Sequence, residues 1–411
     1  MSATGSVEPS PPGPGSQAQK YWYVSHTRPD LSHPVERLIE AARSWRPCAG
    51  RVIEEFDFGA LAARVAGTVP QRPAPGPGPA VPSAVASRVL DVLNYEAHRR
   101  GPAEHLEAER ERLLPRLAVR IESDQPVRVV IPSFPGRPYN PITHQRVAPD
   151  LGEAYAFALL ARISNHVSAV HPPGVQFVLC LDGRAYNPFY GYTGEADHQY
   201  PVDLQRFIDA MGLRRSIALI DLQDLVDERA AEFEALRSQV RDELEREWGR
   251  PDYAFRDELI QTMKLGTNTV ALNAAAVHLM KYPDPARDIG PLFARMREAT
   301  HERARVTAFE YMVFLVTIRR MELIERRLPD AIRGTVHPKP GQYSPYLVSG
   351  ATRVAPWHGV AVLRAGGDID TVYESEVFAD TDRYVAVYLR GDYTPFYYEE
   401  RAAAGAAGPM R

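Results

Sequence analysis

Cysteine and long apolar runs are scarce in this sequence. The 411 residues include two cysteines, Cys48 and Cys180, and neither belongs to a CxxC pair or to a Cys/His spacing typical of zinc. The sequence therefore predicts neither a disulfide framework nor a metal site. It contains no run of about 18 apolar residues, the length that a membrane-spanning helix requires. Its first twenty residues lack the basic and apolar regions of a signal peptide, so we expect a cytoplasmic protein without a membrane partner.

An excess of positive charge is also missing. The formal net charge is -4, so no global field exists to attract nucleic acid. The sequence has no GxGxxG after a strand, no GxxxxGK[ST] loop and no GxSxG elbow, which removes the usual support for dinucleotide, nucleotide triphosphate and serine-hydrolase sites. What is present is 45% hydrophobic and 24% charged residues. This composition is typical of a globular chain, and its length is sufficient to enclose a substrate pocket.

Composition divides the chain into segments. The stretch from 34 to 66 carries apolar residues at helical spacing, and Pro47 and Gly50 break it into two short helices. Segments rich in proline, glycine or alanine cannot hold regular structure. The predicted divisions are disordered tails at 1–20 and 399–411, a helical extension at 21–68, a linker at 69–84, and one catalytic α/β domain at 85–398.

Apolar strands alternate with helical patterns in the first half of this domain, which predicts a parallel sheet covered on both faces. The fold class is therefore α/β, with a mostly parallel, Rossmann-like sheet flanked by helices. Strands are predicted at 126–132, 175–181 and 216–220, and helices at 84–98, 103–114, 150–171 and 204–211. A helical insertion at about 222–328 comprises helices at 222–248, 253–280 and 289–327. A β-rich C-terminal part at 329–398 contains strand-like runs at 332–337, 346–350, 358–365, 371–378 and 384–389.

The densest group of polar residues follows the first predicted strand. It contains Phe134, Arg137 and Asn140, and then Asp150 and Glu153. The carboxyl end of a strand is where open α/β sheets bind ligands. A guanidinium there can hold a phosphate or carboxylate bidentately, although an ordinary exposed loop is the alternative for Arg137 and Asn140. Asp150 and Glu153 have the spacing of a helix capping box, so capping and chemistry both stay open for them.

A second group follows the strand at 175–181. Asp182 and Arg184 flank Gly183, and the segment leads to Tyr190. An acid at the end of a parallel strand is placed to orient an amine or a sugar hydroxyl. Asp-Gly is also a favoured turn pair, which is the alternative interpretation of Asp182.

A third group lies near the C-terminus and combines cations, histidines and a tryptophan. If these side chains converge, they form an anion site or supply a base near neutral pH. The alternative is that each histidine is a packed core residue. The two histidines lack the spacing of a metal site. The members are Arg333, His337, Lys339, Arg353, Trp357 and His358.

Together these groups resemble the motifs of the pyoverdine/dityrosine biosynthesis family, which includes isonitrile (isocyanide) synthases. The family pattern reads FPxKSxN, LPDxGE, a strand ending in SDG, RLSIHP and TPWHG. The matching segments are FPGRPYN at 134–140, APDLGE at 148–153, LDG at 181–183, IRGTVHP at 332–338 and APWHG at 355–359. Their order is preserved over roughly 127–363, so five separate matches carry one resemblance.

The resemblance implies an enzyme of secondary metabolism that converts the α-amine of an amino acid, usually tyrosine or tryptophan, into an isonitrile. Ribulose 5-phosphate or a related sugar phosphate would donate the isonitrile carbon; the yeast branch of the family is associated with N-formyl-tyrosine formation. Such a reaction needs an uncharged amine, cations for the carboxylate and phosphate, and acid–base groups, but no metal or organic cofactor. The implied partners are the two small-molecule substrates, and a homodimer is compatible with the sequence.

On the matching positions, the implied roles divide into catalytic and substrate-binding. The expected catalytic residues are His337, His358, Glu153 and Asp182. The expected substrate-binding residues are Phe134, Arg137, Asn140, Arg184, Tyr190, Arg333, Lys339, Arg353 and Trp357.

The sequence departs from the family pattern where Arg137-Pro138 replaces Lys-Ser. Arginine cannot shuttle protons or form an imine at ordinary pH, so a chemical role of that lysine would be lost, whereas a phosphate-binding role could be kept. We therefore expect a divergent member. Two alternatives stay open: condensation or N-acylation of an amino acid amine, and a metabolite-binding homologue without catalysis.

Overall fold

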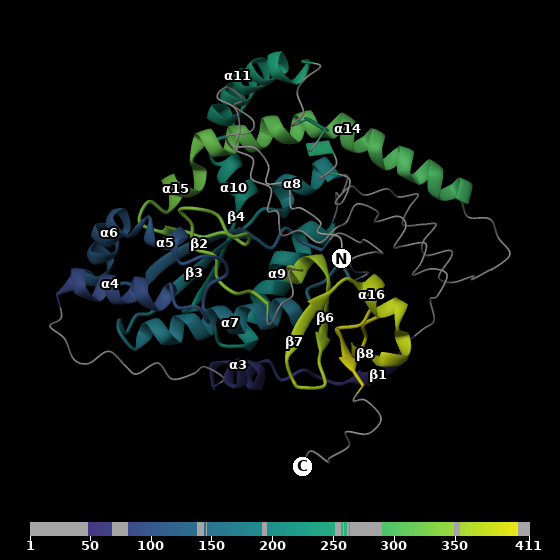
Figure 1. Ribbon diagram of the computed structural model, residues 1–411, viewed down its shortest axis with the longest axis horizontal. Coiled ribbons are helices and arrows are strands. Elements are labelled where there is room, and N and C mark those ends of the chain that lie inside the picture. Colours follow the sequence, from purple (N-terminus) through teal and green to yellow (C-terminus); the bar gives the residue numbers. More distant parts are fainter. Residues whose placement is uncertain are drawn as a thin grey trace, which may run out of the picture.

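The protein contains two β-sheets with helices packed around them (Figure 1). The computed structural model describes residues 48–67, 81–137, 144, 146–190, 195–250, 256–257, 259–260, 263, 290–348 and 354–401.

The first sheet is parallel and contains β2 (Val127–Ser133), β3 (Val175–Leu181), β4 (Ile217–Asp221) and β5 (Ile332–Arg333), in the order β4-β3-β2-β5. The three predicted strands in the first half of the domain are confirmed to within one residue. Val130 is in register with both Val178 and Arg333. Because side chains alternate between the faces of a sheet, these three point to the same face.

Helices cover both faces of this sheet, which confirms the α/β class. The core on one face takes side chains from α3 (Phe58–Gly67), α4 (Pro82–Leu93), α5 (Glu104–Glu107), α6 (Arg110–Glu122), α7 (Leu151–Ser168) and α9 (Glu195–Ala210). The core on the other face takes them from α8 (Gly183–Tyr190), α10 (Leu222–Asp227), α11 (Ala230–Trp248), α14 (Gly290–Met321) and α15 (Leu323–Arg327). We name these the α7 face and the α14 face. Val130, Val178 and Cys180 lie on the α14 face.

The second sheet is mixed, and its strands follow the order β1 (Ala49–Ile53), β8 (Tyr384–Leu389), β9 (Tyr397–Glu400), β6 (Val360–Leu363) and β7 (Ile369–Val372). β1 runs parallel to β8, and β6 runs parallel to β9. The short helices of this region are η1 (Pro356–His358), α16 (Glu374–Ala379) and η2 (Thr381–Arg383). η1, β6 and β7 contact α7, so the second sheet lies next to the helical layer of the first (Figure 1).

The N-terminal segment differs from the predicted pair of short helices. Residues 49–53 form β1 and the helix α3 begins only at Phe58, whereas residues 34–47 lie outside the described part. β1 is mostly exposed and therefore carries no apolar period. Its pairing with β8 joins segments more than three hundred residues apart, which a local pattern cannot show.

Other boundaries also shift. The predicted helix at 222–248 divides into α10 and α11, and most of the predicted helix at 253–280 lies outside the described residues. The run 371–378 is a strand only to Val372. It then becomes α16, in which buried Glu374 accepts a hydrogen bond from Tyr398 Oη at 2.6 Å. Residues 346–348 form no strand, α4 begins inside the predicted linker, and β9 enters the predicted C-terminal tail.

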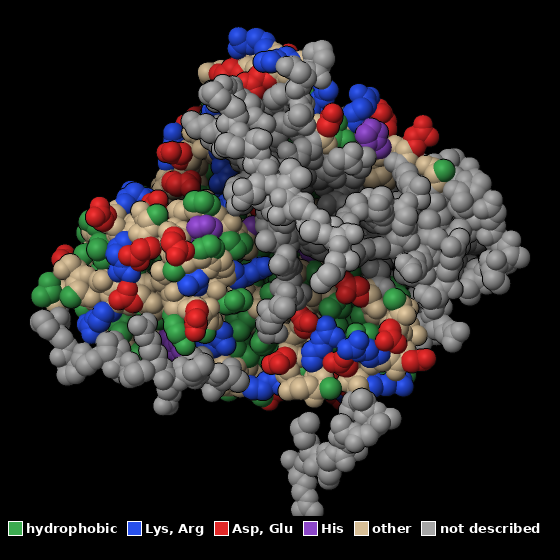
Figure 2. Space-filling model, in the orientation of Figure 1, with side chains coloured by type: hydrophobic (Ala, Val, Ile, Leu, Met, Phe, Trp, Pro, Cys, Tyr) green, Lys and Arg blue, Asp and Glu red, His purple; other side chains and the backbone are tan. Residues whose placement is uncertain are grey.

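Acidic and basic side chains are interspersed over the face seen in Figure 2, in line with the small net charge. Within the described ranges, no helix is both long and apolar enough to cross a membrane.

Candidate functional site

Arg137, in the loop after β2, is the centre of a buried polar network on the α7 side. Its acceptors are Arg146 O, the Glu153 carboxylate, Pro356 O, Gly359 O and the Asp150 carboxylate, at 2.6–3.2 Å. A guanidinium has five N–H donors, and these acceptors occupy them. The side chain has no exposed surface. The prediction that Arg137 binds a substrate anion does not fit this geometry, because the guanidinium links three protein segments instead.

Glu153 and Asp150 begin α7 and share the Arg137 cation. Asp150 Oδ1 accepts from Gly152 N at 2.6 Å and Glu153 Oε2 accepts from Asp150 N at 2.9 Å, which confirms the capping box. Tyr200 Oη donates to Glu153 Oε1 at 3.1 Å. Desolvation raises the pKa of the Asp150 carboxyl; Arg137 opposes this shift and the nearby Glu153 charge adds to it. Glu153 therefore holds helix and loop together through Arg137 and Tyr200, and its catalytic role stays a prediction.

Phe134 and Trp357 meet across more than two hundred residues of sequence. Their ring centroids are 4.6 Å apart, and the ring centroid of Phe157 lies 5.3 Å from that of Phe134. Phe134 and Trp357 are 1% and 4% exposed, so they form packed core rather than the lining of a cavity. Phe134 has φ 56°, a left-handed conformation that is uncommon for a bulky residue and is held here by this packing. The substrate-binding roles of both rings stay predictions.

The same loop fixes the turn after β3. A Cβ atom on Gly183 would lie 1.8 Å from Pro135 O, so only glycine allows the two backbones to come this close. Asn187 Nδ2 also donates to Pro135 O, at 2.9 Å. These two contacts set the position of Asp182, which immediately precedes Gly183.

Asp182 lies at the carboxyl end of β3 and continues the alternation of Val178 and Cys180 toward the α14 face. Its Oδ1 is enclosed and has no hydrogen-bond partner within the described part of the chain. Desolvation raises the pKa of the carboxyl to about 7, and the nearby Asp221 charge adds to the shift, whereas Arg319 and Arg333 oppose it. Asp182 as a whole residue is half-buried, while its carboxyl Oδ1 is enclosed.

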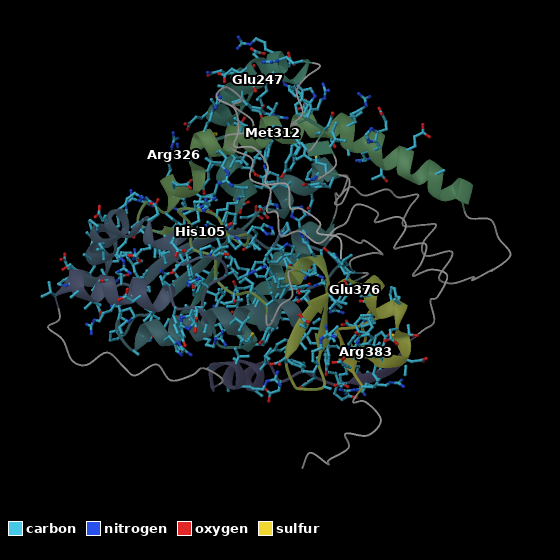
Figure 3. The ribbon with its side chains drawn as sticks, in the orientation of Figure 1. His105, Glu247, Met312, Arg326, Glu376 and Arg383 are labelled. Atoms are coloured by element: carbon cyan, nitrogen blue, oxygen red, sulfur yellow. The ribbon has the colours of Figure 1, made fainter. Side chains whose placement is uncertain are left out.

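Tyr186, Tyr311, Arg319 and Arg333 lie within electrostatic reach of Asp182, and Tyr190 contacts Tyr311. Tyr186 from α8 and Tyr311 from α14 have ring centroids 5.5 Å apart; Tyr311 precedes Met312, which Figure 3 labels. Tyr190 packs edge-on against Tyr311 at 5.7 Å and is hydrogen-bonded to it. Arg333 Nη1 is buried without a hydrogen bond among the described residues. We name Asp182, Tyr186, Tyr190, Tyr311, Arg319 and Arg333 the edge site.

Other predicted site residues lie elsewhere. Arg184 forms ion pairs with Asp224 at 2.8 Å and Asp221 at 3.3 Å, which does not fit its predicted contact with substrate. His337 and Lys339 belong to the half-buried segment after β5, and His358 is exposed at the end of η1; their catalytic and binding roles stay predictions. Asn140 and Arg353 lie outside the described residues.

Sequence motifs identified Asp182, Tyr190 and Arg333 but missed Tyr186, Tyr311 and Arg319. Tyr186 stands four residues after Asp182 and would have been found from helical spacing. Tyr311 and Arg319 belong to a long helix without a recognisable motif, and only the fold brings them to the edge of the sheet. In the described ranges, no group of three or more His, Cys, Asp or Glu side chains is arranged to hold a metal ion.

The carboxyl ends of parallel strands are where open α/β sheets bind ligands, and a carboxyl with a raised pKa at such a place is a candidate for chemistry. Comparison with known proteins makes the class specific. The family model described as pyoverdine/dityrosine biosynthesis protein matches residues 117–385, and the chain belongs to this family.

Two curated relatives and one solved structure extend this result. L-tyrosine isonitrile synthase from Pseudomonas aeruginosa is 28% identical over 290 residues, which cover 67% of this chain and 84% of that protein. L-tyrosine isonitrile synthase from Xenorhabdus nematophila is 22% identical over 290 residues, with 67% and 82% covered. The crystal structure of PvcA from Pseudomonas aeruginosa superposes with a TM-score of 0.56 at 21% identity, over 77% of this chain and all of that one, and supports the fold.

Proposed function

We propose that this protein is an isonitrile synthase that converts the amine of an aromatic amino acid into an isonitrile, in secondary metabolism. The donor of the isonitrile carbon in this proposal is ribulose 5-phosphate or a related sugar phosphate. Family membership and relatives that bear the name L-tyrosine isonitrile synthase support the reaction class. The tyrosines of the edge site suit an aromatic side chain.

The observation that carries the proposal is the state of Asp182. An amino acid amine is protonated near neutral pH and must lose a proton before it can attack a carbonyl group. Asp182 offers an enclosed oxygen without a hydrogen-bond partner among the described residues, on a carboxyl whose pKa desolvation raises to about 7. A base with a pKa near the working pH is effective in general acid–base catalysis.

The other edge-site residues have complementary roles in this proposal. The ammonium group of the substrate lies beside Asp182, which accepts its proton. Arg333, whose Nη1 has no hydrogen bond among the described residues, offers a cation to an anionic group of a substrate. His337 and His358 are retained as candidates for the later proton transfers, and Lys339 as a second cation.

Product analysis tests the proposal directly. The purified full chain is incubated with each of the twenty amino acids and with ribulose 5-phosphate whose carbons carry a heavy isotope. We expect mass spectrometry to detect a product in which the amine has lost two hydrogens and gained one labelled carbon. A formamide or a larger condensation product would instead identify the N-acylation or condensation alternative, and no product with any amino acid would refute the proposal.

Replacement of Asp182 by asparagine tests the role of the carboxyl. Loss of a general base lowers kcat by roughly 10² to 10⁴-fold. In the wild type the rate should rise with pH through about 7, as the carboxyl loses its proton, and this rise should be absent from Asp182→Asn. Arg184→Gln is the matched control, because Arg184 is close in sequence but paired with Asp224. If Asp182→Asn kept the wild-type rate and pH profile, Asp182 would not be the base.

A further inference from the structure

Arg319 stands out among the arginines at the C-terminal end of α14. It lies eight residues after Tyr311, about two turns further along the helix, and its charge acts on Tyr186 and Asp182. The next residue, Arg320, pairs with Glu243 at 2.7 Å, and Arg326 pairs with Glu232 at 2.7 Å. Within the described ranges Arg319 has no such carboxylate partner. Among the described residues, its charge is therefore not neutralised by an ion pair.

Arg333, at the end of β5, also lacks a hydrogen bond at Nη1 among the described residues. It shares the α14 face with Val130, its register partner, and with Cys180. Its nearest carboxylate oxygen is Glu325 Oε1, at 3.5 Å, beyond normal hydrogen-bond length. Desolvation lowers the pKa of the Arg333 guanidinium, and the positive charge of Arg319 is the next largest cause. The two guanidinium groups thus repel each other where water is partly excluded. This repulsion destabilises the unliganded protein unless an anion lies between them.

We propose that Arg319 and Arg333 together bind an anionic oxygen group of a substrate, either the α-carboxylate of the amino acid or the phosphate of the sugar phosphate. The identity of these substrates rests on the proposed function. Two guanidinium groups can each give two parallel N–H donors to such a group. Asp182 lies within electrostatic reach of both arginines, so an amino acid could place its ammonium group beside the acid and its carboxylate beside the bases.

Ligand binding without turnover tests the site. Thermal unfolding of the full chain is followed with L-tyrosine, with ribulose 5-phosphate and with inorganic phosphate. We expect Arg319→Gln to weaken the binding of one anionic ligand at least about tenfold, the loss expected for a charge-assisted hydrogen bond. Loss of L-tyrosine binding identifies the carboxylate as the occupant; loss of ribulose 5-phosphate and phosphate binding identifies the phosphate. Arg319→Lys should recover part of the affinity.

The stability of the unliganded protein separates a binding role from a structural one. Arg319→Gln should unfold at the wild-type temperature or higher, because it removes the repulsion with Arg333. The matched control Arg320→Gln should unfold at a lower temperature and keep its ligand binding, because it breaks the ion pair with Glu243. The proposal would be overturned if Arg319→Gln bound every ligand as tightly as the wild type, or if the wild type bound none of them.

The outcome can be separated from the fate of the proposed function. Anion binding that depends on Arg319, without isonitrile formation, would refute the function and leave the site intact. Isonitrile formation with unchanged binding and unchanged KM values in Arg319→Gln would refute the site and leave the function intact.

Discussion

At the scale of single residues, Arg137 shows how a motif position can change its role. Arg137→Leu would leave the Asp150 and Glu153 carboxylates buried without their cation, and we expect it to lower the free energy of unfolding by about 3 to 5 kcal/mol. Arg137→Lys restores the charge but supplies three donors in place of five, so it should cost less, at least about 1 kcal/mol. Urea unfolding of both variants measures this order. A lysine variant as stable as the wild type would show that the guanidinium fork is not required.

Gly183 permits a second prediction at this scale. Gly183→Ala would bring a Cβ atom against the backbone of Pro135, which cannot rotate away, and should cost about 3 kcal/mol or more. It should also reduce activity, because Asp182 precedes the displaced residue. Gly366→Ala is the control, since a Cβ atom there meets open space. Equal thermal stability of the two variants would contradict the close approach that defines the turn.

The residues of the candidate site were only partly predictable from the sequence. Motifs selected Arg137, Glu153 and Asp182 because their residue types suit chemistry, but a motif does not state which side chains become neighbours. Arg137 takes Gly359 O as an acceptor from 222 residues away, and this contact, with Glu153, makes it structural. Asp182 has no such partner among the described residues, and this difference separates a candidate base from a buried link.

At the scale of elements, the sequence predicted what periodicity controls. β3 has the predicted limits, because its residues, apart from Gln176, are apolar and buried on both faces of the sheet. β1 was missed, because an exposed edge strand is defined by its pairing with β8 and not by its own pattern. α16 was mistaken for a strand because its residues suit either form; the helix begins with a capping box in which Glu376 accepts from Tyr373 N, a contact that strand-like composition does not reveal.

β1 leads to a prediction of its own. A chain that begins at Glu54 would lack this strand and leave the edge of β8 unpaired, together with Glu399, which Arg51 otherwise contacts. We expect a loss of stability on the order of 1 to 3 kcal/mol and increased self-association, since an open strand edge pairs with other chains. Thermal unfolding and light scattering measure the two effects. A chain that begins at Cys48 is the control, because it retains β1; identical behaviour of the two chains would refute the prediction.

At the scale of the whole molecule, one polar network joins the two sheets. Asp150 Oδ2 accepts from Ala361 N at 3.2 Å on β6, while Arg137 reaches from the loop after β2 to Pro356 and Gly359. The motif segments at 134–137, 150–153 and 356–359 therefore connect the two sheets. The edge site lies on the opposite, α14 face. The loop after β2 that connects the two sheets also positions Asp182, because Pro135 contacts Gly183 and Asn187.

Two buried titratable groups give the molecule opposing responses to pH. Burial raises the pKa of Asp182 to about 7 and lowers the pKa of His98 to about 4. Between about pH 4 and 7 the folded state therefore holds a proton on Asp182 that the unfolded chain has released, so this group contributes less stability as pH rises. Over about pH 4 to 6.5 the unfolded chain holds a proton on His98 that the folded state excludes, so this group contributes more stability as pH rises.

Each substitution should remove one of these slopes from the whole-molecule profile. Relative to the wild type, Asp182→Asn should make stability rise more steeply, or fall less, with pH by about 1.4 kcal/mol per pH unit. His98→Asn should change the slope by a similar amount in the opposite direction, because it removes the imidazole whose pKa burial lowers. The asparagine amide can still donate to Val92 O, which His98 Nδ1 now contacts at 2.8 Å. Urea unfolding from pH 4.5 to 6.5 measures both slopes. Parallel profiles for the wild type and both variants would mean that neither group changes its proton affinity on folding, and Asp182 would lose the property that suits it to act as a base.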